Sequence, residues 1–88
     1  MPIPLVTRVL VADDHPIVRS GLRTVIDAEP DLEVVAEAEN GADAVKSALA
    51  ADVDLAILDV AMPKLTGIQA AAELHRQKPE LRLLMLSM

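Results

Sequence analysis

Three short, largely apolar runs constrain the fold of this chain more than any other feature of its 88 residues. They cover residues 9–12, 53–58 and 81–86. A strand that is apolar on both sides is typical of the interior of a parallel sheet, where helices cover both faces. The stretches between the runs are long enough to cross from one parallel strand to the next. The sequence therefore predicts an α/β fold.

The intervening stretches predict three helices, over residues 17–28, 42–51 and 68–78. In the first helix, apolar residues recur at helical spacing while Arg19 and Arg23 fall on the polar side. At the start of the third helix, Thr66 and Gln69 are three residues apart, a Thr-x-x-Gln pattern typical of a capping box. Its predicted buried stripe comprises Ile68, Ala71, Ala72 and Leu74.

Residues 32–38 differ from the three runs because apolar residues alternate there with Glu33 and Glu37. Such alternation predicts a strand at the edge of the sheet. The element order is then β-α-β-α-β-α-β, and right-handed crossovers leave few ways to arrange it. The flavodoxin-like strand order 2-1-3-4 keeps the alternating strand at an edge. The predicted architecture is a three-layer sandwich, with helices on both faces of a parallel sheet.

Composition excludes several kinds of site. The chain has no cysteine, which excludes disulfides and thiolate metal sites, and no Phe, Tyr or Trp to stack on bases. Together with a formal net charge of −6, this makes direct contact with nucleic acid by this segment unexpected. No apolar run approaches the roughly 18 residues of a membrane span. Residues 1–7 contain two prolines and no charged side chain, and we interpret them as a flexible leader.

Oxygen-bearing side chains follow three strands that are adjacent in this strand order. Asp13 and Asp14 follow the first strand, Asp59 the third and Ser87 the last. Because parallel strands end at the same edge of a sheet, we expect these side chains to converge. Two carboxylates about 4 Å apart repel by roughly 4 kcal/mol at an effective dielectric constant of about 20, and a divalent cation relieves that repulsion. Few protein ligands, all of them oxygen atoms, favour Mg²⁺ over calcium or zinc.

A carboxylate beside Mg²⁺ can attack a phosphoryl group and form an acyl phosphate. One of these carboxylates could therefore accept a phosphoryl group, and Ser87 could hydrogen-bond a phosphoryl oxygen from the next strand. Taken singly, residues of these types are more commonly helix caps or loop residues. Their joint position on adjacent strand ends favours a site.

The same residues occur in motifs that resemble a known family, the receiver domain of bacterial two-component response regulators. The resemblance is carried by Val-Leu-Val-Ala-Asp-Asp-His-Pro at 9–16, by Leu-Asp-Val-Ala-Met-Pro at 58–63 followed by Gly67, and by Leu-Met-Leu-Ser-Met at 84–88. The Asp-Asp-His-Pro form is most similar to the NarL/FixJ type, whose output is usually a LuxR-type helix-turn-helix domain. The resemblance covers the chain from Arg8 onward.

The resemblance implies a role for each of these residues. Asp59 matches the phosphoacceptor, and Asp13 with Asp14 matches the acidic pair that holds Mg²⁺ together with Asp59. The backbone carbonyl of Ala61 matches a further metal ligand, and Ser87 matches the switch Ser/Thr. The implied function is phosphotransfer to Asp59 from a sensor histidine kinase in the cytoplasm. Phosphorylation would then control a DNA-binding output domain that regulates transcription, and the segment would be no enzyme beyond this self-phosphotransfer and autodephosphorylation.

Two alternatives remain open. A receiver-like fold can act as an interaction module without phosphorylation, and a small Mg²⁺-dependent phosphatase can use the same nucleophile. The phosphatase is disfavoured because Ala61 stands where its second acid would be.

The resemblance also implies elements that residues 8–88 do not include, namely a fifth strand with its flanking helices in the order 2-1-3-4-5. The family's lysine is expected there, so no catalytic lysine is assigned in this segment. Residues 81–86 would then form an uncovered apolar edge, and such edges favour pairing with another chain. We expect a polypeptide that ended at Met88 to associate through this edge, and we expect a homodimer.

Overall fold

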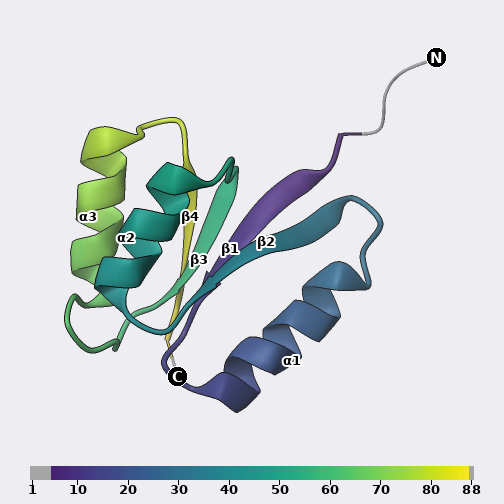
Figure 1. Cartoon of the computed structure of the whole chain (residues 1–88), viewed down its shortest axis with the longest axis horizontal. Coiled ribbons are helices and arrows are strands. Elements are labelled where there is room, and N and C mark those ends of the chain that lie inside the picture. The colour runs from purple at the N-terminus through teal and green to yellow at the C-terminus, as the bar shows by residue number, and fades with distance from the viewer. Residues whose placement is uncertain (1–4, 88) are drawn as a thin grey trace.

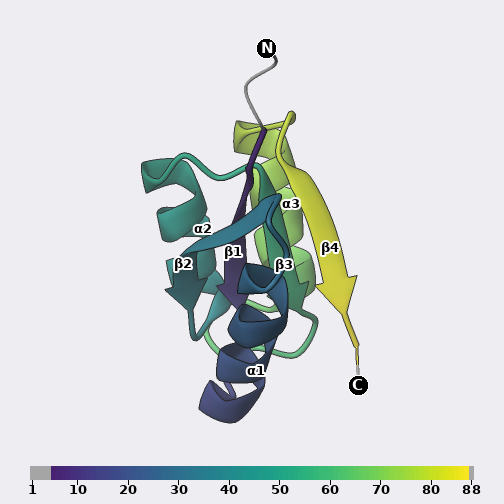
Figure 2. The same cartoon turned by 90° about the vertical axis from the view of Figure 1, so that its right-hand side faces the viewer.

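A four-stranded parallel sheet lies between helices in this computed structural model, which describes residues 5–87 (Figure 1). The elements are β1 (Thr7–Ala12), α1 (Pro16–Asp27), β2 (Leu32–Ala38), α2 (Gly41–Ala50), β3 (Leu55–Asp59), α3 (Gly67–Gln77) and β4 (Arg82–Leu86). The strand order is β2-β1-β3-β4, which confirms the predicted flavodoxin-like order. Helix α1 covers one face of the sheet, and α2 and α3 cover the other (Figures 1 and 2).

Strand β1 is the centre of both hydrophobic cores. Val9 and Val11 point to the core under α1, whereas Leu10 and Ala12 point to the core under α2 and α3. All four side chains are buried, as expected for a strand that is apolar on both sides. At the edge, β2 alternates between buried and more exposed residues, as its sequence predicted. The burial pattern therefore follows the apolar runs of the sequence.

The beginning of β1 differs slightly from the prediction. Strand pairing starts at Thr7, whose backbone N–H donates to the carbonyl of Asp31 at 2.8 Å. The last residue of the expected leader 1–7 is therefore part of the sheet. Residues 1–4 lie outside the described part of the chain.

The buried stripe of α3 was predicted correctly at Leu74 but not at the other three positions. The buried residues are Gly67, Ala70 and Leu74, whereas Ile68 is 63% exposed. Gly67 sets this rotation because its Cα lies against the end of β3, where an added Cβ would be 2.0 Å from the carbonyl oxygen of Asp59. The predicted capping box is confirmed: the Thr66 hydroxyl accepts from the N–H of Gln69, and the Gln69 side chain accepts from the N–H of Thr66.

Apolar side chains remain exposed on the α1 side of the molecule. Ile17 is 87% exposed and Val25 is 68% exposed, and Ile26 is the only buried residue of α1. Leu84, on the outer strand β4, is 48% exposed. Association through this edge remains a prediction. Within residues 5–87, no helix combines the length and hydrophobicity that a membrane span requires.

Candidate functional site

An acidic cluster lies where β1 and β3 end side by side. The two strands pair in parallel, with Ala12 opposite Leu58, so the residues after them meet at one edge of the sheet. Ligand atoms of Asp13, Asp14, His15 and Asp59 lie within 4.8 Å of one another. The structure thus brings together the three carboxylates that the sequence predicted, and it adds a histidine.

Asp13 is the buried member of the cluster and contacts His15. Its side chain is only 6% exposed, and its Oδ1 accepts from the backbone N–H of His15 at 2.8 Å. The same oxygen lies 2.9 Å from Nδ1 of the His15 ring. This hydrogen bond to Asp13, followed by the charge of Asp14, raises the pKa of His15 above its usual value. His15 occupies the cap position of α1, but its side chain makes no capping hydrogen bond.

Asp14 contributes a carboxylate oxygen that lacks a hydrogen-bond donor. Its Oδ1 is buried and accepts no hydrogen bond, although it lies 3.0 Å from Nδ1 of His15. That ring nitrogen carries at most one hydrogen, and Oδ1 of Asp13 lies slightly closer to it, at 2.9 Å. A buried oxygen without a donor is costly, and a bound cation would satisfy it. The geometry therefore fits a site for a hard metal ion.

Asp59 ends β3 beside the end of β4. Its Oδ1 accepts from the backbone N–H of Ala61 at 3.2 Å. The next residue, Val60, donates its N–H to the carbonyl of Leu86 at 2.9 Å, and Leu86 is the strand partner of Asp59. Ser87 follows Leu86 directly and is exposed. The end of β4 is therefore coupled through the backbone to the residue after Asp59.

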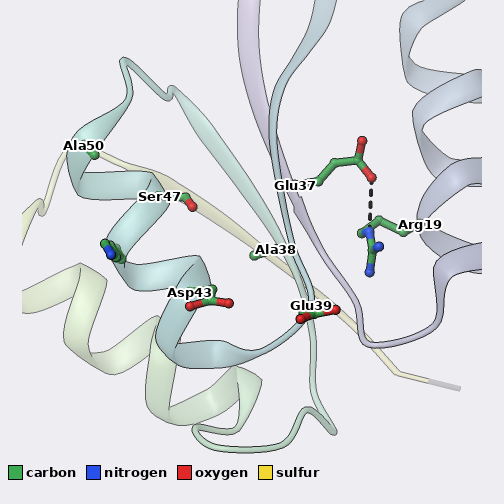
Figure 3. A pocket seen from close by; sticks show the side chains of 8 residues that line it. Arg19, Glu37, Ala38, Glu39, Asp43, Ser47 and Ala50 are labelled. Atoms are coloured by element: carbon green, nitrogen blue, oxygen red, sulfur yellow. Dashed lines mark hydrogen bonds and ion pairs between the residues drawn. The ribbon is translucent and has the colours of Figure 1, made fainter.

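A separate open cleft of about 510 Å³ lies between α1, β2 and α2 (Figure 3). Arg19 and Glu37 line its α1 side and face one another, with Nε of Arg19 donating to Oε1 of Glu37 at 3.1 Å. The carboxylates of the acidic cluster do not line this cleft. Arg19 lies on the polar side of its helix as predicted, and its side chain is 19% exposed.

Two residues near the cluster were not anticipated as parts of a site. His15 was given no role in the site, although its position two residues after Asp13 permits the observed local hydrogen bond. Arg19 reaches the cluster through the backbone carbonyl of Asp13, at 2.8 Å from Nη1. Side-chain periodicity carries no signal for a bond to a backbone carbonyl in another segment.

Comparison with known proteins identifies the class that this fold and site define. Residues 9–88 match the response regulator receiver domain, and the chain therefore belongs to this family.

The similar proteins include DNA-binding regulators and isolated receiver domains. The DNA-binding transcriptional activator DevR/DosR of Mycobacterium tuberculosis is 41% identical over 80 residues, which are 91% of this chain and 37% of that protein. The structure of the NarL receiver domain from the same organism has a TM-score of 0.91 and 37% identity, covering 96% of this chain and 68% of that one. The response regulator TrrA of Thermotoga maritima was solved in complex with Mg²⁺ and BeF. Its structure has a TM-score of 0.85 and 34% identity, and the match covers 92% of this chain and 69% of that one. The chain spans 34% to 38% of the length of the first curated relatives, all of them transcriptional regulators.

Proposed function

We propose that this receiver domain accepts a phosphoryl group on Asp59 from a phosphohistidine of a sensor histidine kinase, in a Mg²⁺-dependent reaction. The observation that carries the proposal is the convergence of Asp13, Asp14 and Asp59, with one buried Asp14 oxygen that has no hydrogen-bond donor. Asp59 is the acceptor because it ends the central strand β3. Asp13 is less suited because its Oδ1 already serves the backbone and ring of His15.

The donor set fits Mg²⁺. Asp14 and Asp59 would hold the ion, with Asp13 beside them and the backbone carbonyl of Ala61 as a further oxygen ligand. Oxygen ligands in this number, with positions left for water and phosphate, are what Mg²⁺ prefers. When bound, the ion would neutralise negative charge on both the carboxylate and the incoming phosphoryl group.

The transfer replaces one bond to phosphorus by another. A carboxylate oxygen of Asp59 forms the new O–P bond while the P–N bond of the phosphohistidine breaks. The electron pair of that bond returns to the imidazole nitrogen of the kinase, and Asp59 becomes an acyl phosphate. Asp59 supplies the attacking oxygen, and the metal ion held beside it by the acidic cluster would bring the phosphoryl group into position.

Phosphorylation adds about −1.5 to −2 units of charge and strong hydrogen-bond acceptors beside the end of β4. We propose that Ser87 hydrogen-bonds the phosphoryl group and thereby moves the end of β4. Support comes from the position of Ser87 directly after Leu86, the strand partner of Asp59. This change would control an output domain that binds DNA and regulates transcription. We expect the protein to form a homodimer. DevR/DosR is named as a DNA-binding transcriptional activator, which supports this kind of output.

Treatment of the full-length protein with a small phosphodonor, such as acetyl phosphate, tests the proposal. We expect a slower band in phosphate-affinity electrophoresis when Mg²⁺ is present, and no such band when EDTA removes it. A protein that stays unmodified with Mg²⁺, but still regulates its output, would instead be a phosphorylation-independent interaction module.

Asp14→Asn should abolish stabilisation by Mg²⁺ while making the metal-free fold more stable. The substitution removes a cation ligand, and it also removes a negative charge that repels Asp13 and Asp59, by roughly 4 kcal/mol for charges about 4 Å apart at an effective dielectric constant of about 20. At a Mg²⁺ concentration of about 100 times Kd, the wild type should gain about 2.7 kcal/mol. Thermal unfolding followed by circular dichroism, with and without Mg²⁺, measures both effects.

The matched control is Asp31→Asn, which removes the same charge at an exposed residue before β2. This variant should keep the full Mg²⁺ effect. An equal Mg²⁺ shift in the wild type and in Asp14→Asn would show that Asp14 is not a ligand.

A further inference from the structure

We propose that Arg19 is a positioning residue of the metal site, because it fixes the peptide group that joins Asp13 to Asp14. The inference rests on the Mg²⁺ site of the proposed function and adds a residue that lies outside the acidic cluster. Arg19 is on α1, and its guanidinium joins the loop after β1 to the edge strand β2.

Two hydrogen bonds hold the backbone of Asp13 from opposite sides. Its N–H donates to the carbonyl of Ala38 at 3.0 Å, and its carbonyl accepts from Nη1 of Arg19 at 2.8 Å. The carbonyl of Asp13 and the N–H of Asp14 belong to one planar peptide group. Fixing that plane fixes the direction in which Asp14 leaves the strand. The position of its carboxylate, including the buried oxygen that lacks a donor, depends on this direction.

The guanidinium of Arg19 is itself held in place. Its Nε donates to Oε1 of Glu37 at 3.1 Å, as Figure 3 shows, and Oε2 of Glu37 accepts from Nη1 of Arg23. The Arg19 side chain is only 19% exposed, so this arrangement is partly shielded from water. A planar guanidinium can bind a carboxylate and a carbonyl at once, which a lysine ammonium does less well.

Arg19 is a cation close to a site that binds cations, and this makes the sign of its effect informative. If only its charge mattered, removing it would reduce repulsion and tighten Mg²⁺ binding. If it positions Asp14, removing it should weaken Mg²⁺ binding despite the lost charge. Loss of a residue that orients a metal ligand typically weakens affinity by about 10-fold or more.

Arg23 provides a matched control on the same helix. It donates to the same Glu37, carries the same charge, and has no hydrogen bond to Asp13 among those of the described residues. Its side chain is 51% exposed, so its charge is largely screened by salt. Arg23→Met should therefore change Mg²⁺ affinity by no more than about twofold.

The experiment measures Mg²⁺ affinity by isothermal titration calorimetry in the full-length protein, for the wild type, Arg19→Met and Arg23→Met. We expect an approximately 10-fold loss of affinity in Arg19→Met alone. Unchanged or tighter binding in Arg19→Met, or equal losses in both variants, would overturn the inference. If Arg19→Met does not fold, as judged by circular dichroism, Arg19→Lys takes its place, because it keeps the charge but spans the two acceptors poorly.

A second measurement needs no metal ion. The amide resonance of Asp14 in a ¹H–¹⁵N spectrum reports on the peptide group that Arg19 holds, and it should shift in Arg19→Met but not in Arg23→Met. Absence of that shift would overturn the positioning role. Absence of Mg²⁺ binding in the wild type would instead overturn the proposed metal site, and Arg19 could then have no role in it.

Discussion

Asp59→Asn is expected to reduce phosphorylation by a small phosphodonor to below detection in the presence of Mg²⁺. The amide that replaces the carboxylate is a poor nucleophile, so no acyl phosphate can form at this position. Shape and size are nearly unchanged, and the side-chain oxygen can still accept from the N–H of Ala61, as Oδ1 of Asp59 does at 3.2 Å. The fold should therefore persist. Phosphate-affinity electrophoresis, with circular dichroism as a check of folding, measures the result.

Asp52→Asn is the control for this prediction. Asp52 is exposed and pairs with Arg8, and it lies before β3 rather than at its end. Its variant should be phosphorylated like the wild type. A shifted band of full intensity in Asp59→Asn would show that another residue is the acceptor.

Gly67→Ala is expected to lower the free energy of unfolding by about 3 kcal/mol, at the upper end of the usual cost of overpacking. The added Cβ would lie 2.0 Å from the carbonyl oxygen of Asp59 and 2.7 Å from its carbonyl carbon. Both atoms are backbone, so the clash cannot be relieved by a side-chain rotation. The N–H of Gly67 also donates to the carbonyl of Val60 at 3.0 Å, and this contact must stretch if α3 moves away. Urea unfolding measures the loss.

Gly21→Ala provides the contrast, because nothing lies within 4 Å of the Cβ that it would add. Gly21 is inside α1, where alanine is favoured over glycine by about 0.8–1.0 kcal/mol. This variant should therefore be more stable than the wild type. A Gly67→Ala protein with unchanged stability would mean that α3 does not pack as closely on the end of β3 as the structure shows.

The strand order and the acidic cluster could be predicted because they follow from features that a sequence displays. Apolar runs identify strands that are covered on both faces, and the handedness of crossovers then limits their order. Once β1 and β3 are neighbours, the carboxylates of Asp13, Asp14 and Asp59 must lie at one edge. None of these steps requires knowledge of side-chain rotation.

The rotation of α3 and the contacts of Arg19 could not be predicted in this way. Helix α3 turns Gly67 and Ala70 toward the sheet because small residues allow a close approach, whereas a hydrophobic pattern favours the larger Ile68. The sequence placed Arg19 on the polar side of its helix but did not indicate its partners, which are a carboxylate on β2 and a backbone carbonyl. Such contacts depend on distances between elements, which the spacing of residues along one helix does not contain.

Direct mapping of the phosphorylated residue tests the central claim, because Asp59→Asn would remove a metal ligand as well as the acceptor. An acyl phosphate can be reduced with borohydride, which converts the modified aspartate into homoserine. Peptide mass spectrometry of the wild-type protein then identifies the converted residue. The account predicts homoserine at position 59, only in samples treated with both phosphodonor and Mg²⁺. Homoserine at position 13 or 14, or at no position in a fully folded and Mg²⁺-bound protein, would contradict it.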